Sequence, residues 1–338
     1  MDKIRLIVSD MDGTLLNEKQ ELSSDTIKIL IQAQQQGIGV VLASGRGLKD
    51  LIGYGKQLEL GQYPLSGYIT LNGLELYDSK RKCIEKQQRL TYADIITFNK
   101  ISLKYQIPLI IFFEDTSYLL NSTSINKSYL VDTSWVENSN MDLIKKQDET
   151  KLLKIVLCGN EESIEYMLNH LDENIFNQYE ISKVEKQWVE INPKGINKGY
   201  GLLKYLNQYH LAKDEVVVFG NGENDISMLK QTPNSVVVEN ALDGVKKYAT
   251  YLCKNNNEDQ PSRRRIIPYK RINVALFHTA GKSKFLISIP EKPERQQVDS
   301  IIQYAGYRPC SRHLLFRFPP VFPQNSLADN TNHHIIRQ

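Results

Sequence analysis

The sequence predicts an α/β protein built around a doubly wound parallel sheet, and three features carry this prediction. Short apolar runs recur along the 338 residues, and amphipathic helical segments separate them. Several of these runs end in glycine or in polar residues, which is typical of parallel strands whose carboxyl ends face a ligand. The chain is also long enough for two domains with well-buried cores.

The alternation of strands and helices begins at the N-terminus. Residues 4–9 predict a central strand because they are apolar nearly throughout, as strands buried on both faces are. A helix follows, for which Ser23 or Ser24 would supply the N-cap. Residues 38–45 and 68–73 predict two further strands of the same sheet.

The order of elements changes near residue 78, where strands and helices become mixed. This mixture favours a smaller α+β domain, inserted into the first domain over residues 78–187. Its expected elements are helices over 92–105 and 161–171 and strands over 108–114, 118–121, 151–159 and 179–184, and a further strand over 188–191 follows them.

The α/β pattern then resumes and completes the first domain. We therefore expect a discontinuous core made of residues 1–77 and 188–259. The elements expected in its second part are helices over 197–211, from Asp225 and over 243–249, with strands over 215–219 and 236–238.

Two carboxylates stand where the first strand ends, in the stretch Asp10-Met11-Asp12-Gly13. Gly13 permits a tight turn that brings backbone N–H groups close to an anion. An Asp-Gly pair also favours an ordinary turn at the end of a strand. This stretch alone leaves a ligand site and a simple turn equally open.

Four motifs together resemble the haloacid dehalogenase (HAD) phosphatases. They are DMDGTLL, ASGR, NKGYGL and GNGENDISML, in this order, and the resemblance covers about residues 3–259. The insert between the second and third motifs resembles the cap of the Cof-type subgroup, which has a class IIB cap. The resemblance implies a Rossmann-like HAD core with an inserted α+β cap domain. It also implies a Mg²⁺-dependent phosphomonoester hydrolase that works through an aspartyl phosphate.

The resemblance further implies a role for each motif residue. Asp10 would attack phosphorus as the nucleophile, and Asp12 would act as general acid and base. Lys198 would neutralise charge between the nucleophile and the phosphate. Thr14, Ser44 and Asn224 would bind the phosphoryl group.

The same resemblance implies a magnesium site. Asp10, the backbone carbonyl of Asp12, Asn221 and Asp225 would hold or support the ion, because Mg²⁺ prefers oxygen ligands.

Two residues near these motifs keep alternative interpretations. Arg46 would contact the phosphate or order the hinge of the cap, or would form a structural salt bridge. Asn72, which precedes Gly73, would close a strand beside the site, and a simple turn explains it equally well.

Asn221 departs from the family pattern, which usually has an aspartate after the glycine at this point. An amide oxygen can coordinate Mg²⁺, but it brings no negative charge. Three interpretations follow: a tolerated ligand, with Glu223 or Asp225 compensating; a low-activity or substrate-binding relative; or a side chain that points away. We favour the tolerated ligand, because Asp10, Ser44 and Lys198 are all present.

The C-terminal part has a different composition from the rest of the chain. Residues 1–259 contain 29 basic and 35 acidic side chains, whereas residues 260–338 contain 13 and 4. We expect this basic tail not to belong to the phosphatase fold, as a shifted reading frame or a fused neighbouring sequence would produce. The rival interpretation is a patch for nucleic acid or an anionic surface, centred on residues 263–265 and 270–271.

Bulk properties narrow the class of function. No apolar run approaches the length of a membrane span, and the mean hydropathy is −0.40. The N-terminus does not resemble a signal peptide, and four widely spaced cysteines indicate reduced, buried thiols. We expect a cytoplasmic protein whose partner is a small phosphorylated metabolite such as a sugar phosphate, pyridoxal phosphate or flavin mononucleotide. A phosphomutase and a non-catalytic phosphometabolite-binding protein remain the alternatives.

Overall fold

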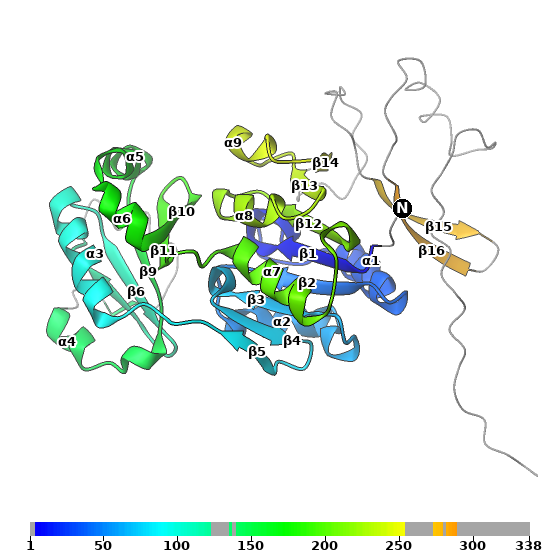
Figure 1. The fold of residues 1–338 in the computed structure, drawn as a ribbon, viewed down its shortest axis with the longest axis horizontal. Helices are drawn as coiled ribbons and strands as arrows, with labels where there is room; N and C mark the ends of the chain where they lie inside the picture. The colour runs from blue at the N-terminus through cyan, green and yellow to red at the C-terminus, as the bar shows by residue number, and fades with distance from the viewer. Residues whose placement is uncertain (1–3, 123–134, 137–139, 254–272, 280–281, 289–338) are drawn as a thin grey trace, which may run out of the picture.

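The computed structural model describes residues 4–122, 135–136, 140–253, 273–279 and 282–288. These residues form an eight-stranded sheet, a six-stranded sheet and a two-stranded sheet. The two larger sheets lie in separate lobes, with the eight-stranded sheet on the right of Figure 1 and the six-stranded sheet on the left. This arrangement confirms the predicted class, a doubly wound parallel core with an inserted α+β domain, here called the cap.

The core sheet has the order β14-β13-β12-β1-β2-β3-β4-β5. Its strands run parallel from β14 to β3, and β4 and β5 extend it as antiparallel strands. The central strand β1 pairs with β2 on one side and with β12 on the other. The bounds are β1 Leu6–Asp10, β2 Gly39–Ala43, β3 Gly67–Thr70, β4 Glu75–Asp78, β5 Cys83–Lys86, β12 Val216–Gly220, β13 Asn234–Val238 and β14 Tyr251–Cys253.

Helices cover both faces of the core sheet, which explains why its central strands are apolar throughout. Alternate residues of β1 face opposite sides, so that Ile7 packs with one hydrophobic cluster and Val8 with the other. Helices α1 (Ser24–Gln35) and α2 (Leu48–Gln57) belong to the first side. Helices α7 (Lys198–Gln208), α8 (Ile226–Leu229) and α9 (Asp243–Lys246) belong to the second.

Of the two caps expected for α1, the structure selects Ser23. Its side chain accepts a hydrogen bond from the backbone N–H of Thr26, which satisfies one of the free donors in the first turn.

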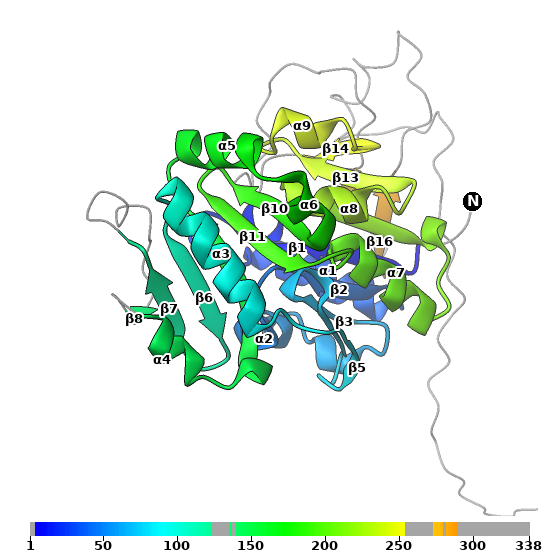
Figure 2. The same cartoon turned by 60° about the vertical axis from the view of Figure 1, so that its left-hand side comes forward.

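The cap is a six-stranded sheet with helices on one face. The strand order is β10-β11-β9-β6-β7-β8, and α3 and α5 lie on the side of this sheet that faces away from the core (Figures 1 and 2). The opposite face of the sheet is therefore turned toward the core. The bounds are α3 Tyr92–Tyr105, β6 Leu109–Phe113, β7 Ser117–Leu120, β8 Trp135–Val136, α4 Met141–Lys145, β9 Leu152–Cys158, α5 Glu161–His170, α6 Glu173–Gln178, β10 Tyr179–Glu185 and β11 Trp188–Pro193.

The sheet topology corrects the predicted domain boundaries. Strand β5 pairs with β4 in the core sheet, although residues 78–187 were expected to belong to the cap. Strand β11 pairs with β9 and β10 in the cap sheet, although residue 188 was expected to begin the second part of the core. Backbone pairing decides both boundaries, and an apolar run of residues does not reveal its pairing partner. The cap therefore lies between β5 and α7.

The first crossing from core to cap is anchored by a buried arginine. The guanidinium of Arg89 donates to Glu75 of β4 at 2.6 Å, to Glu114 of the cap at 3.0 Å and to the backbone carbonyl of Thr150 at 2.5 Å. The side chains of Arg89 and Glu75 are only 8% and 5% exposed, so the charge-assisted bond between them is largely shielded from water, whereas Glu114 is 43% exposed. They tie the crossing segment to both lobes.

The described part of the tail is a separate hairpin. Strands β15 (Asn273–Thr279) and β16 (Lys282–Ser288) are antiparallel and pair with each other, and neither is a strand of the two larger sheets. The basic stretch at 263–265 and 270–271 lies outside the described residues. The expectation that residues 260–338 are foreign to the phosphatase fold stays a prediction.

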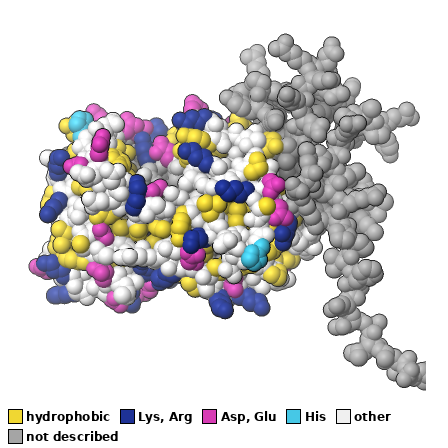
Figure 3. All heavy atoms as spheres, in the orientation of Figure 1, with side chains coloured by type: hydrophobic (Ala, Val, Ile, Leu, Met, Phe, Trp, Pro, Cys, Tyr) yellow, Lys and Arg dark blue, Asp and Glu magenta, His cyan; other side chains and the backbone are white. Residues whose placement is uncertain are grey.

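Surface properties of the described residues agree with a mixed-charge exterior. On the face drawn in Figure 3, lysine and arginine side chains are interspersed with aspartate and glutamate. Within the described ranges, no helix combines the length and apolar character that crossing a membrane requires. Cys158 is buried, whereas Cys83 is exposed on the edge strand β5, so the expectation of buried thiols is wrong for Cys83.

A substitution at the start of α7 can test how tightly this helix packs against its neighbour α8. A Cβ at Gly199 would collide with the backbone oxygen of Ser227, which the core holds in place. We expect Gly199→Ala to lower the free energy of unfolding by about 1–3 kcal/mol, measured by urea denaturation. Gly53→Ala is the matched control: Gly53 is exposed in α2 with open space around it, so its replacement should be stabilising by about 0.5–1 kcal/mol. Equal effects of both substitutions would contradict this packing.

Candidate active site

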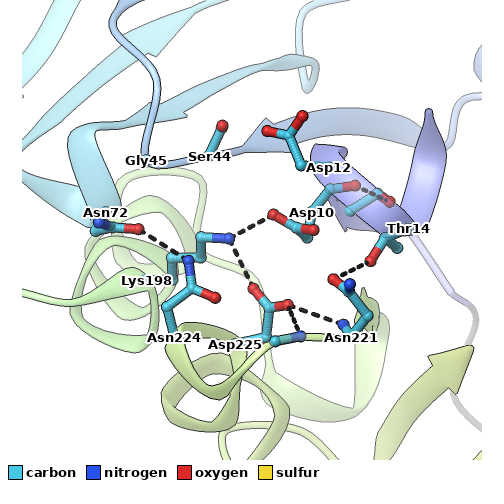
Figure 4. Close-up of polar contacts among 12 residues, drawn as sticks. Asp10, Asp12, Thr14, Ser44, Gly45, Asn72, Lys198, Asn221, Asn224 and Asp225 are labelled. Atoms are coloured by element: carbon cyan, nitrogen blue, oxygen red, sulfur yellow. Dashed lines mark hydrogen bonds and ion pairs between the residues drawn. The ribbon is translucent and has the colours of Figure 1, made fainter. Parts of the chain in front are cut away.

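The carboxyl ends of the parallel strands bring the motif residues together. Asp10 is the last residue of β1, Ser44 follows β2, Asn72 lies in the 3₁₀ turn after β3 (Leu71–Gly73), and Asn221 follows β12. Because β1 lies between β2 and β12, these ends meet where the order of strands reverses, the usual ligand site of such sheets. Figure 4 shows their side chains gathered together.

Lys198 occupies the centre of this cluster. It is the first residue of α7, and its side chain is fully buried. Its ammonium donates to Asp10 Oδ1 at 2.5 Å and to Asp225 Oδ1 at 2.7 Å. Burial would lower the pKa of Lys198, but the carboxylates of Asp10 and Asp225 outweigh it and raise this pKa above its ordinary value. The lysine is therefore charged and joins three segments of the chain.

Asp10 lies in an environment that disfavours its negative charge. Burial and the nearby carboxylate of Asp225 raise the pKa of Asp10 to about 7, although Lys198 opposes them. Two buried carboxylates share one ammonium here. The cluster thus has a surplus of negative charge, which a bound cation would neutralise.

Asp225 orders the loop that follows β12. Its Oδ2 accepts hydrogen bonds from the backbone N–H groups of Asn221 and Gly222, each at 2.9 Å. Its Oδ1 is held by Lys198. A Cβ at Gly220 would lie 2.6 Å from the Cβ of Asp225, so the strand can end this close to the carboxylate only with glycine. Asp225 therefore fixes both the loop and the lysine.

Asn221 faces the first motif. Its Oδ1 accepts a hydrogen bond from the hydroxyl of Thr14 at 2.8 Å. Gly13 has a φ of 73°, and a Cβ at this position would collide with Asn221 Nδ2. The Asn221 side chain thus packs against the turn that follows the first strand, beside Asp10 (Figure 4). It does not point away from the site.

The oxygen atoms at this edge of the sheet can bind a hard divalent cation. Together they carry less negative charge than three carboxylates would. Among the described residues, no group of three or more His, Cys, Asp and Glu side chains forms a metal site by itself. The side chains of Asp10 and Asn221 offer a carboxylate and an amide oxygen, and Asp225 stands behind them with both of its oxygens already accepting hydrogen bonds (Figure 4). These are ligands that Mg²⁺ accepts, and the surplus negative charge favours a cation.

Asp12 and Arg46 form an ion pair at the rim. The guanidinium donates from Nε to Asp12 Oδ2 at 3.0 Å and from Nη2 to Asp12 Oδ1 at 2.5 Å. Nη2 also donates to Gln20 Oε1 at 2.5 Å. Among the interpretations of Arg46, the structure shows the salt bridge. The Asp12 side chain is 34% exposed and that of Asp10 only 7%, so Asp12 is the carboxylate within reach of solvent.

Three polar residues complete the cluster on the other side of Asp10. The hydroxyl of Ser44 accepts from the backbone N–H of Arg46 at 3.1 Å. The backbone N–H of Asn72 donates to the carbonyl of Ser44 at 3.0 Å. Asn224 Nδ2 donates to Asn72 Oδ1 at 3.3 Å. The structure thus places the residues given roles by the motifs at one edge of the sheet. The side chain of Glu223, named as a possible replacement for the missing charge of Asn221, is exposed in the turn after β12.

Sequence reasoning missed two residues of the cap that touch this cluster. Glu190 of β11 accepts from Asn72 Nδ2 at 2.5 Å, and Lys154 of β9 donates to the carbonyl of Gly45 at 3.2 Å. A signal was present: Glu190 is a single acid in an otherwise apolar run over 188–191, the pattern of a buried carboxylate with partners.

Comparison with known proteins agrees with this geometry. The family model described as haloacid dehalogenase-like hydrolase matches residues 7–260, which is most of the chain. This chain belongs to the haloacid dehalogenase-like hydrolases. The match ends where the composition of the tail begins to differ.

Several relatives of this HAD protein are named as phosphatases. It is 28% identical to the 5-amino-6-(5-phospho-D-ribitylamino)uracil phosphatase of Bacillus subtilis, over 76% of this chain and 92% of that protein. Its fold is similar to that of a haloacid dehalogenase-like hydrolase from Bacteroides thetaiotaomicron, with a TM-score of 0.63 and 25% identity over 76% of this chain and 96% of that one. A subclass IIB sugar phosphatase shares the fold at a TM-score of 0.61 and 21% identity, over 75% and 95% of the two chains. The protein is a Cof-type HAD phosphatase.

The crowded charges predict that the active site lowers the stability of the metal-free protein. The folded-state pKa of Asp10 lies above its ordinary value of 3.8, so the folded state binds a proton more tightly than the unfolded state between about pH 4 and 7. Stability from this group therefore falls as the pH rises through that window. In the presence of a chelator, Asp10→Asn should be more stable than the native chain by about 1–2 kcal/mol at pH 8, and the two should converge near pH 4.

Urea denaturation at the two pH values measures this difference. Asp243→Asn serves as the control because the Asp243 side chain is 99% exposed. A variant Asp10→Asn that is less stable than the native chain at pH 8 would show that Lys198 needs both carboxylates.

Proposed function

We propose that this HAD phosphatase is a Mg²⁺-dependent phosphomonoester hydrolase that acts on a small phosphorylated metabolite through an aspartyl phosphate. The supporting observation is the buried Lys198, which holds Asp10 and Asp225 at the strand edge while Asp12 stands at the rim. One carboxylate is held in place as a nucleophile, and a second is exposed enough to exchange protons with substrate and water.

In the first half-reaction, an oxygen of Asp10 attacks the phosphorus atom and the bond to the leaving alkoxide breaks. Asp12, in its protonated form, gives its proton to that alkoxide. Ser44 and Asn224 donate hydrogen bonds to the phosphoryl oxygens, and Lys198 offsets the charge that gathers between them and Asp10. Thr14 donates its hydroxyl proton to Asn221 in this structure, so it would have to turn toward the phosphoryl group to do the same. The product alcohol leaves, and the phosphoryl group stays on Asp10.

In the second half-reaction, a water molecule attacks phosphorus and gives its proton to the Asp12 carboxylate. The bond from phosphorus to Asp10 breaks, which releases inorganic phosphate and restores the nucleophile. The ion pair with Arg46 holds the Asp12 carboxylate at the rim of the site, where it meets substrate and water. An incoming phosphate dianion competes with Asp12 for Arg46, which agrees with a second role for Arg46 in phosphate binding.

Asp10, the backbone carbonyl of Asp12 and Asn221 would hold the Mg²⁺ ion, with Asp225 supporting the site from behind through Lys198 and the β12 loop. When bound, the ion supplies positive charge that stabilises the phosphoryl oxygens. Asn221 brings one negative charge fewer than an aspartate would, so we expect weaker metal binding than in a site with aspartate. The two buried carboxylates on a single ammonium support a cation here.

The cap would supply substrate specificity. Its sheet faces the core, and β10 lies against the 3₁₀ turn Glu223–Asp225 beside the site. A cap in this position limits the leaving group to a small molecule and excludes bulk water. We place the substrate among sugar phosphates, pyridoxal phosphate and flavin mononucleotide, a range that fits the phosphoribityl compound of the Bacillus subtilis relative.

The decisive test is hydrolysis of a generic aryl phosphate with and without Mg²⁺. We expect the native chain to turn over only with Mg²⁺, and Asp10→Asn to lose at least about 10³-fold in kcat because the nucleophile is absent. Asn221→Asp should lower the Mg²⁺ concentration needed for half-maximal activity, because it adds a negative charge beside the cation.

The two substitutions serve as controls for each other. Turnover by Asp10→Asn at the native rate would reject the proposed nucleophile. Turnover by Asn221→Asp alone, with an inactive native chain, would favour a phosphometabolite-binding protein whose site the amide has switched off. Exchange of labelled phosphate between substrates without net release would favour a phosphomutase.

A further inference from the structure

The core-facing side of the cap carries an ion pair that touches the candidate active site. The ammonium of Lys154 in β9 pairs with Oε1 of Glu190 in the neighbouring strand β11. The Glu190 side chain is 4% exposed and that of Lys154 14%, so the pair is nearly buried. The indole N–H of Trp188 also donates to Glu190 Oε1, at 3.3 Å. The charge of Glu190 is thus satisfied from within the cap.

The second oxygen of the same carboxylate contacts the core. Glu190 Oε2 accepts from Asn72 Nδ2 at 2.5 Å, across the interface between the lobes. Lys154 crosses the same interface and donates to the carbonyl of Gly45 at 3.2 Å. One buried ion pair of the cap therefore contacts the ends of both β2 and β3, where the phosphate-binding residues are expected.

A carboxylate at this position decides how the amide of Asn72 is oriented. Ionised carboxylates only accept hydrogen bonds, so Asn72 must turn its NH₂ group toward Glu190 and its oxygen the other way. That oxygen accepts from Asn224 Nδ2, which in turn fixes the direction of the Asn224 amide. Both Asn72 and Asn224 are buried, at 2% and 8% exposed, so water does not replace these partners freely. Glu190 of the cap therefore determines, through Asn72, how the amide of Asn224 is oriented, and Asn224 is expected to bind the phosphoryl group.

The backbone in this region is shaped around the contact. Asn72 has a φ of 53°, in the left-handed region, and its N–H bonds to the carbonyl of Ser44. A Cβ at Gly45 would lie 2.6 Å from Glu190 Oε2, so glycine is what allows the carboxylate to approach this loop. Glu190 is held by three donors and has little freedom to move aside.

We propose that Glu190 is a positioning residue for phosphoryl transfer: from the cap, it orients the Asn72 and Asn224 amides and, with Lys154, holds the Ser44–Gly45 loop in place. The expected effect of Glu190 on the rate of hydrolysis rests on the proposed function. The contacts of Glu190 with Asn72 and the Ser44–Gly45 loop can be tested without measuring turnover. Glu190 touches neither the nucleophile nor the general acid in this arrangement.

Glu190→Gln tests the proposal because it keeps the shape and removes the charge. A glutamine amide has only one oxygen that can accept hydrogen bonds. If this oxygen faces Lys154 and Trp188, the NH₂ group of the glutamine points at the NH₂ group of Asn72, and two donors then meet. With Mg²⁺ and an aryl phosphate, we expect kcat/KM to fall about 10–100-fold and the inhibition constant of inorganic phosphate to rise with it. Glu165→Gln is the matched control, since Glu165 pairs with Lys183 inside the cap, and it should stay within about twofold.

Hydrogen exchange gives a readout that does not depend on activity. In Glu190→Gln, the amides of Leu71 and Asn72 should exchange faster than in the native chain, because their acceptors belong to the Ser44–Arg46 loop. The amides of β1 should keep their native rates, which verifies that the core is folded. Gly45→Ala perturbs the same contact from the core side and should reproduce the pattern, even where a Glu190 variant fails to fold.

The outcomes separate this inference from the proposed function. Faster exchange at residues 71–72 in a chain without phosphatase activity would support the link and reject the proposed function. Native exchange rates in both Glu190→Gln and Gly45→Ala, or an unchanged inhibition constant for phosphate in an active Glu190→Gln enzyme, would overturn the positioning role.

Discussion

The contact on which the rest of the structure depends is the buried ammonium of Lys198 between the carboxylates of Asp10 and Asp225. Burying three charges is costly, and removing one partner of a buried pair leaves an uncompensated charge. The arrangement therefore holds the end of β1, the start of α7 and the loop after β12 at fixed positions relative to one another. Its charges are also unbalanced, since two acids share one base. A cation or a proton restores the balance, which links the stability of the fold to the occupancy of the site.

Parallel strands explain why a few short motifs place so many side chains at one point. Asp10, Ser44, Asn72 and Asn221 are far apart in the chain, but Asp10 ends a strand of one sheet and the other three each follow a strand of that sheet. Strong apolar runs and small polar strand ends made this edge predictable from sequence. The helical pattern over residues 92–105 also predicted α3 at its observed bounds. The role of each residue rests on the motifs and stays a proposal, whereas the geometry shows which of these residues lie together.

Features that depend on pairing across long sequence distances were not predictable in this way. The membership of β5 and β11 follows from backbone pairing, which apolar patterns do not encode. A structural salt bridge was one of several interpretations of Arg46, and only the fold shows that its partner is Asp12. Glu190 and Lys154 lie in strands of the cap, whose register places them over the core. A charged residue in an apolar strand indicates that a partner exists, but the sequence does not identify that partner.

The separation of the two sheets has a consequence for how this protein can change. Among the described strands, none pairs across from the cap sheet to the core sheet, and the chain leaves the core after β5 and returns before α7. The cap is thus a replaceable module, which evolution or an engineer can exchange without altering the hydrogen bonding that supports the nucleophile. The contacts that constrain a replacement include Arg89 at the crossing and Lys154 and Glu190 on the sheet face. Strand β10 adds to them through its packing on the turn Glu223–Asp225 and through the hydrogen bond from Asn197 to Glu180. Leaving-group preference can therefore diverge quickly while the phosphoryl-transfer machinery stays the same.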